Sequence, residues 1–318
     1  QLVAGPIERS TNLLPQFYQK HTISYERVRD GIIFILWGFF KKVVVADRLS
    51  EYVNLVYNNA SQYEGIHFLI ATFFFSVQIY CDFSGYSDIA IGTAKIMGFD
   101  LMINFRRPYF AKSIREFWQR WHISLSTWFR DYVYIPLGGN RVSKPRYYFN
   151  LFFTFLVSGL WHGANWTFVI WGALHGFYSV FAVWTKNLKE KINKFTGLAD
   201  LPRLHNGIQI VTTFILAYFA WIFFRANSLS DAFFIIKSIG SLKLNTNINL
   251  FQYPVDMPIS IVLIIILFVI DILQEKKMLN APAFAIYRPL KWAFLVALIL
   301  FIVVLGIWKE TDFLYFQF

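Results

Sequence analysis

The sequence has few charged residues and almost no cysteine. Only 15% of its 318 residues are charged and Cys81 is the single cysteine, which excludes an internal disulfide and any cysteine-rich metal site. We find no internal repeat, low-complexity tract or Gly/Ser-rich linker. The simplest organisation is one membrane-embedded domain over residues 1–318. Because Gln1 is neither an initiator methionine nor part of a signal-peptide pattern, we expect the N-terminal helices of a longer protein to be missing.

Apolar side chains dominate the composition, at 56% hydrophobic and 20% aromatic residues. They gather in long runs that a soluble core of this length would not need. These runs predict membrane helices at residues 31–46, 66–81, 148–160, 166–184, 207–225, 259–274 and 292–308. The sequence therefore predicts an all-α, polytopic membrane helix bundle.

Two of these spans are weak. Lys41 and Lys42 interrupt the first, and the third has little more than a dozen residues before Trp161, against the roughly 20 that a crossing needs. Irregular backbone is tolerated at membrane depth only where protein or water satisfies its polar groups. Short or broken segments therefore favour re-entrant or tilted helices around a cavity.

The formal net charge of +11 is concentrated in two loops. Nine Arg or Lys residues between Arg106 and Arg146 face only two acidic ones, and a second basic loop spans residues 186–203. The positive-inside rule makes both loops cytoplasmic, with the less basic residues 47–64 and 227–256 outside. This bias, together with attraction to anionic lipid head groups, accounts for the charge without a nucleic-acid partner.

A first polar cluster, residues 158–166, contains His162 between two glycines and two tryptophans. An imidazole exchanges protons near neutral pH, glycine permits close approach of backbone or substrate, and indoles can exclude water. We interpret His162 as a candidate general base. The alternative is a histidine that only forms a hydrogen bond between helices.

A second cluster, residues 115–131, lies in the first basic loop. As one continuous helix it would place Arg115, Trp118, His122 and Ser126 on one face. His122 would then be a partner of His162, with arginines binding donor phosphates through bidentate contacts. The candidate arginines are Arg115, Arg120 and Arg130. The alternative is an amphipathic helix at the membrane interface.

A third cluster, residues 80–88, holds two acidic residues and two serines at the end of an apolar run. It lacks the Gly-x-Ser-x-Gly pattern of a nucleophile elbow, and Asp82 and Asp88 alone make a poor metal site. We expect no metal here, and interpret these residues as polar contacts between helices or as the lining of a cavity entrance.

Several motifs occur in order along nearly the whole chain. They are Gly5-Pro6-Ile7-Glu8-Arg9, residues 82–88, residues 104–109, residues 116–126, Leu160-Trp161-His162-Gly163-Ala164 and, at the C-terminus, residues 313–318. Together they resemble the membrane-bound O-acyltransferase superfamily, and more narrowly its alginate O-acetyltransferase branch. The resemblance implies a many-helix fold with a central channel, in the cytoplasmic membrane of a bacterium.

The same resemblance implies an essential His162 with His122 as its companion. His162 would act as general base on an acceptor hydroxyl, while His122 orients it or stabilises the developing oxyanion. Asn165 and the backbone near Gly163 are candidate further donors, Trp161 and Trp166 would exclude water, and Ser126 is assigned to the channel. No bound cofactor is expected, since the donor, acetyl-CoA or another cytoplasmic acyl thioester, is a substrate.

The implied acceptor is a hydroxyl of a cell-surface polysaccharide or an extracytoplasmic acetyltransferase partner. Three alternatives remain. A related branch would transfer D-alanyl groups or acetylate peptidoglycan, a transporter or channel would carry out no acyl chemistry, and a scaffold would not need His162. The glycine-flanked histidine favours an enzyme over the last two and does not separate the branches.

Overall fold

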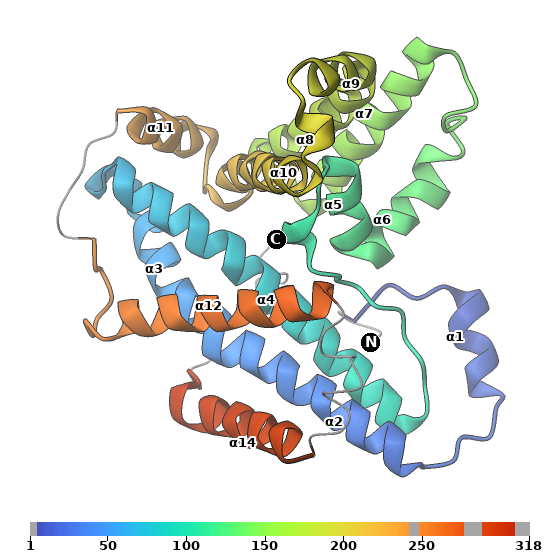
Figure 1. Ribbon diagram of the computed structural model, residues 1–318, viewed down its shortest axis with the longest axis vertical. Helices are drawn as coiled ribbons and strands as arrows, with labels where there is room; N and C mark the ends of the chain where they lie inside the picture. The colour runs from blue at the N-terminus through green and yellow to red at the C-terminus, as the bar shows by residue number, and fades with distance from the viewer. Residues whose placement is uncertain (1–4, 242–247, 277–287, 309–318) are drawn as a thin grey trace. The chain divides into compact units, whose positions relative to one another are not determined.

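Helices are the only regular secondary structure among the residues that the computed structural model describes, which are 5–241, 248–276 and 288–308 (Figure 1). The all-α prediction is confirmed. The chain divides into two units, residues 1–104 with 244–318 and residues 105–243. The single-domain organisation stays a prediction, and the motif at residues 313–318 lies outside the described residues.

The first unit is built around a long helix, α4. Its helices are α1 (Ser10–Phe17), α2 (Tyr25–Phe39), the π-helix η1 (Phe40–Ala46), α3 (Asp47–Asn58), α4 (Gly65–Met97), α12 (Asp256–Glu275) and α14 (Arg288–Leu305). The backbones of α2 and α4 approach closely where glycines meet: a Cβ on Gly38 would lie 2.5 Å from the carbonyl oxygen of Gly85. Small residues permit this close packing of apolar helices.

Two lysines of η1 pair with acidic residues of α4. The Lys41 ammonium donates to Ser84 Oγ at 2.8 Å and to the Asp88 carboxylate at 2.6 Å. Lys42 lies 2.6 Å from the Asp82 carboxylate. Because a charge at membrane depth is costly unless it is paired, these contacts explain how lysines interrupt an apolar run. The third cluster therefore makes polar contacts between helices.

These pairs also correct one predicted boundary. The sequence predicts that the span at residues 66–81 ends where the polar residues begin, but α4 continues through Asp82 and Asp88 to Met97. Its polar residues face η1 and are satisfied there. The first predicted span, residues 31–46, is α2 followed by the π-helical turn η1.

The second unit contains the two histidines of interest. Its helices are α5 (Ile114–Arg120), α6 (Ile123–Phe129), the π-helix η4 (Arg130–Tyr134), α7 (Lys144–His162), α8 (Trp166–Trp184), α9 (Lys186–Phe195), α10 (Pro202–Arg225) and α11 (Leu229–Gly240). Helices α7 and α8 form an antiparallel hairpin with close backbone contact, since a Cβ on Gly159 would lie 2.3 Å from the Phe168 carbonyl oxygen.

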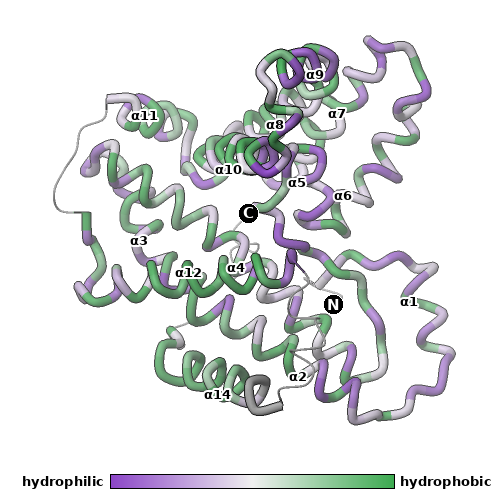
Figure 2. Tube along the Cα trace, in the orientation of Figure 1, coloured by the Kyte–Doolittle hydropathy of each residue, from purple (hydrophilic) through white to green (hydrophobic). Residues whose placement is uncertain are grey.

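Within the described ranges, four helices are long and apolar enough to cross a membrane: α4, α8, α10 and α12. A shorter apolar helix covers Trp292–Leu305, and hydrophobic colour extends along most of α12 and α14 (Figure 2). The chain is thus a multi-pass membrane protein. The two spans that looked weak in the sequence, at residues 31–46 and 148–160, are not among the four.

Candidate active site

His162 is the last residue of α7, at the turn between α7 and α8. Aromatic rings surround it on several sides: the ring centroids of Trp161 and Trp171 lie 5.0 Å away and that of Phe224 lies 5.3 Å away. Gly163 follows, where a Cβ would lie 2.7 Å from the Phe168 ring. A half-buried imidazole in an aromatic surround is shielded from bulk water on those sides.

His122 lies in a strained backbone position. Its φ of 41° is in the left-handed region, which non-glycine residues seldom occupy, and such outliers cluster at functional sites. The side chain is buried, its Nδ1 lies 3.3 Å from Ser124 Oγ, and its ring stacks on Phe105. Burial lowers the pKa of His122 well below its usual value, and charge on His162 would lower it further. His122 is therefore a neutral imidazole at physiological pH.

The break at His122 corrects the predicted helix. Residues 115–131 do not form one helix with a shared face, because α5 ends at Arg120 and α6 begins at Ile123. Trp121 and His122 form the junction between these two helices of 7 residues each.

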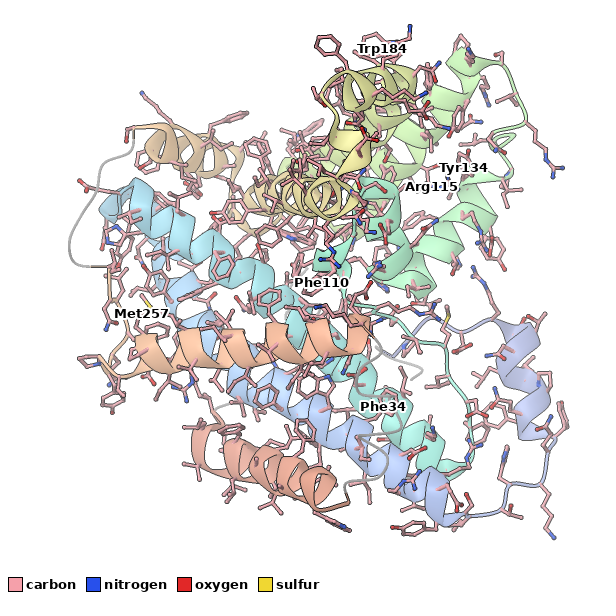
Figure 3. All side chains as sticks on the ribbon, in the orientation of Figure 1. Phe34, Phe110, Arg115, Tyr134, Trp184 and Met257 are labelled. Atoms are coloured by element: carbon pink, nitrogen blue, oxygen red, sulfur yellow. The ribbon has the colours of Figure 1, made fainter. Side chains whose placement is uncertain are left out.

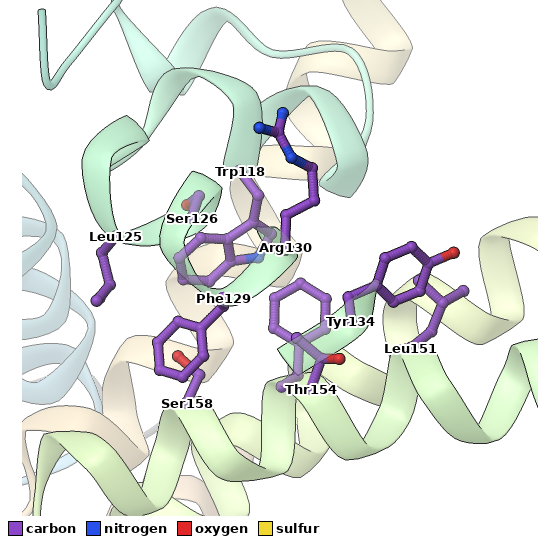
Figure 4. A pocket seen from close by; sticks show the side chains of 10 residues that line it. Trp118, Leu125, Ser126, Phe129, Arg130, Tyr134, Leu151, Thr154 and Ser158 are labelled. Atoms are coloured by element: carbon purple, nitrogen blue, oxygen red, sulfur yellow. The ribbon is translucent and has the colours of Figure 1, made fainter. Parts of the chain in front are cut away.

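A cavity of about 160 Å³ lies among α5, α6, η4 and α7 (Figure 4). It is lined by Trp118, Leu125, Ser126, Phe129, Arg130, Tyr134, Leu151, Thr154, Phe155 and Ser158. The α7 residues at 151, 154, 155 and 158 have the spacing of one helix face, so the cavity follows α7 for about two turns. Ser158 is one turn before His162 on α7, and neither His162 nor His122 is among the lining residues.

Two of the three predicted arginines are near this cavity. Arg130 lines it, although its Nε also donates to the half-buried Asp131 at 2.7 Å. Arg115 lies near Tyr134, another lining residue (Figure 3). Burial raises the pKa of Tyr134 to about 12, and the Arg115 charge opposes that rise. Arg120 instead pairs with Glu116 at 2.7 Å, so it makes a contact within α5.

Asn165 caps α8 and connects it to the residue 227 backbone. Its side-chain oxygen accepts from the backbone N–H of Thr167 at 3.1 Å, which caps α8, and its nitrogen donates to the carbonyl of Asn227. Its role as an oxyanion donor stays a prediction. Trp161 is in ring contact with His162, whereas Trp166 is 68% exposed at the start of α8.

Three further residues surround this site. Sequence reasoning missed Trp171 and Phe224, and it predicted His175 to be a packing or hydrogen-bonded residue, which the hydrogen bond from Trp118 confirms. Trp171, Phe224 and His175 come from α8 and α10, and His175, fully buried, lies with its ring centroid 5.0 Å from that of Trp171. The Trp171 ring contacts the rings of His162 and His175. Within the described residues, Trp171 Nε1 and His175 Nε2 have no hydrogen-bond partner. In the sequence, the turn between the two apolar runs indicates that α8 packs against α7, which brings Trp171 and His175 close to the end of α7. No local pattern predicts the position of Phe224.

The sequence pattern of the membrane-bound O-acyltransferase family matches residues 1–228, which include His122, His162 and the whole cavity. The chain belongs to the membrane-bound O-acyltransferase family. The resemblance carried by the sequence motifs is thereby confirmed, and the polytopic helical fold agrees with it.

Named relatives narrow the position within the family. The chain is 43% identical over 241 residues to a probable alginate O-acetylase of Pseudomonas aeruginosa, which covers 76% of this chain and 44% of the relative. It is 39% identical over 244 residues to a peptidoglycan O-acetyltransferase of Helicobacter pylori, covering 76% and 45%. A teichoic acid D-alanyltransferase of Streptococcus thermophilus is 30% identical over 264 residues, covering 74% and 60%.

The chain thus spans less than half the length of the alginate and peptidoglycan relatives. It is similar to the alginate O-acetylase-like branch of the acyltransferase family, with 40 to 44% identity to further probable alginate O-acetylases from other Pseudomonas species.

Proposed function

We propose that the protein is a membrane O-acyltransferase that moves an acetyl group from a cytoplasmic thioester across the membrane to a hydroxyl acceptor. The observation that carries this is the position of His162, in an aromatic surround one helical turn beyond the α7 cavity. Membership of the acyltransferase family supports the same reaction class.

His162 is the general base in this proposal. Its imidazole takes the proton of the acceptor hydroxyl as that oxygen attacks the thioester carbonyl carbon, forming a tetrahedral oxyanion. Collapse of the oxyanion breaks the carbon–sulfur bond and leaves an O-acetyl ester. The protonated His162 then returns its proton to the departing thiolate, so that the base is regenerated.

His122 acts as the companion of His162. A buried neutral imidazole has one N–H, which can donate to the oxyanion as charge develops on it. Ser124 Oγ, 3.3 Å from Nδ1, and the stacked Phe105 ring hold the His122 ring in place. The surrounding Trp161, Trp171 and Phe224 keep water from hydrolysing the thioester.

The donor is acetyl-CoA or another acyl thioester, and the cavity is its proposed channel. The lining is mostly aromatic and aliphatic, with Arg130 among it and Arg115 nearby. Guanidinium groups bind phosphates well, and an apolar channel suits the thioester arm. Arg120 takes a lesser part, because it already pairs with Glu116.

The acceptor is a cell-surface polysaccharide resembling alginate, reached directly or through an extracytoplasmic acetyltransferase partner. Identity to probable alginate O-acetylases supports this choice. The setting is the bacterial cytoplasmic membrane, with the basic loops on the cytoplasmic side. Transfer to peptidoglycan or of D-alanyl groups is the second candidate, supported by relatives of those names.

Donor turnover in membrane vesicles tests the reaction class. Vesicles carrying the full-length protein are supplied with radiolabelled acetyl-CoA on the cytoplasmic side, and label in polysaccharide, peptidoglycan and free acetate is counted. The proposal expects label in polysaccharide. It also expects Arg130→Gln to raise the acetyl-CoA concentration needed for half-maximal transfer. Arg141→Gln, a change of equal charge outside the cavity lining, serves as control. Substrate flux without donor turnover would favour a transporter, and label confined to peptidoglycan would favour the second candidate.

A further inference from the structure

A second hollow of the α5–α11 unit lies between α7 and α8. This groove, of about 360 Å³, is lined by Tyr148, Phe177, Val180, Phe181 and Trp184. It shares no lining residue with the α7 cavity. The proposed acyl transfer therefore leaves this groove without a role.

The groove has the character of a surface that meets hydrocarbon. Phe177, Phe181 and Trp184 are spaced by four and three residues on α8, and are 57%, 43% and 68% exposed. Phe177 stacks on Phe181 at 5.8 Å between ring centroids. Helix α8 is one of the four helices able to cross a membrane, so the aromatic stripe lies where acyl chains run.

One end of the groove is basic. Tyr148 is in the first turns of α7 and Trp184 is the last residue of α8, so the groove reaches the end of the hairpin where α7 begins. The basic side chains near that end are Lys144, Arg146, Lys186 and Lys189. The Lys189 ammonium lies 5.9 Å from the centroid of the Phe181 ring, a lining residue. Trp184 has the place of an interfacial tryptophan.

Helix α9 extends this basic end along a membrane surface. Four lysines against one acidic residue, Glu190, make it strongly cationic. Its Leu188 and Ile192, four residues apart, are 56% and 49% exposed and form an apolar face. A lysine-rich amphipathic helix with such a face lies in the head-group region.

We propose that the α7–α8 groove binds one phospholipid with an anionic head group. An acyl chain fills the groove along Phe177 and Phe181, and the phosphate lies at Lys189, with Lys186 and Arg146 adding positive charge. The net cationic end selects an anionic lipid over a zwitterionic one, because each basic residue near the surface attracts anionic head groups. A zwitterionic lipid would fill the groove equally well and gain little from the lysines.

Counting the lipids that remain bound tests this proposal. The full-length protein is reconstituted in bilayers of phosphatidylethanolamine and phosphatidylglycerol, re-extracted in mild detergent and analysed for both lipids by mass spectrometry. Lys189→Gln removes the charge at the groove, and Lys194→Gln removes the same charge further along α9. A third variant, Val180→Trp, fills the groove with a larger side chain. Gel filtration checks that each variant is monodisperse.

The proposal expects phosphatidylglycerol to be enriched over its bulk ratio in the wild type. Lys189→Gln should reduce that enrichment about fivefold, the effect of losing one basic contact near the surface, and Lys194→Gln should leave it unchanged. Val180→Trp should remove the retained lipid. Equal loss in both lysine variants would mean general electrostatic attraction. No loss in Lys189→Gln would mean that Lys189 does not bind the head group, and equal retention of both lipids in the wild type would mean annular lipid alone. Each of these three results overturns the proposal.

Discussion

The indole N–H of Trp118 donates a hydrogen bond to Nδ1 of His175, with 3.2 Å between the two nitrogens. Trp118 lines the α7 cavity, and His175 lies behind it, fully buried. The His175 ring also contacts Trp171, which contacts His162. A series of packed rings thus connects the cavity wall to the proposed base, and places His175 as a positioning residue.

His175→Phe should weaken donor binding more than it slows turnover. The substitution keeps an aromatic ring but removes the acceptor, and a buried N–H left unsatisfied costs about 1–3 kcal/mol, so Trp118 should move. His175→Gln restores an acceptor and should recover part of the effect. Initial rates over a range of acetyl-CoA concentrations give KM and kcat for each variant. If the Phe and Gln variants have the same KM, the hydrogen bond does not position Trp118.

Lys41→Met should destabilise the first unit strongly. It leaves Asp88 without its ammonium partner, and breaking a buried ion pair from one side costs about 3–5 kcal/mol. The double variant Lys41→Met/Asp88→Leu should recover most of that loss, because both charges are removed. Chemical denaturation in mixed micelles measures the free energy of unfolding.

A control for this pair is available in the same unit. Arg29 pairs with its neighbour Asp30 near the surface, where the two side chains are 48% and 36% exposed, and Arg29→Met should change stability by about 0–1 kcal/mol. If Lys41→Met lowers the free energy of unfolding no more than Arg29→Met does, the η1–α4 contacts do not stabilise the helix pair.

His122 should make stability depend on pH. Its pKa in the folded protein is well below the usual value, whereas in the unfolded chain it is about 6.5. Below about pH 6.5 the unfolded state therefore binds a proton that the folded state does not, and stability falls as pH falls. His122→Asn should show a smaller loss of Tm between about pH 7.5 and 5.5. Equal losses in the two proteins would mean that His122 is not held neutral by the fold.

Sequence patterns located the strongly apolar elements well. The span predicted at residues 166–184 coincides with α8, and those at 207–225 and 259–274 lie within α10 and α12. Apolar runs of this length have few alternative structures in a membrane. The end of α4 was mispredicted because Asp82 and Asp88 look like a boundary until the lysines of η1 are seen opposite them.

The site was predictable only in part. His162 stands out because glycine and tryptophan surround it in the sequence, and it lies where α7 turns into α8. The prediction of one continuous helix was wrong at His122, because nothing in residues 115–131 indicates a residue with left-handed backbone between two short helices. Phe224 reaches His162 from α10, and such a tertiary contact leaves no local pattern.

The most direct test of the account is surface-polysaccharide O-acetyl content in cells whose own copy is deleted. They are complemented with the full-length protein as wild type, His162→Ala or His122→Ala, at matched membrane expression. The account predicts that His162→Ala inserts normally but abolishes acetylation, with His122→Ala strongly reduced. Acetylation at the wild-type level in His162→Ala would contradict the assignment of His162 as the base, and with it the proposed mechanism.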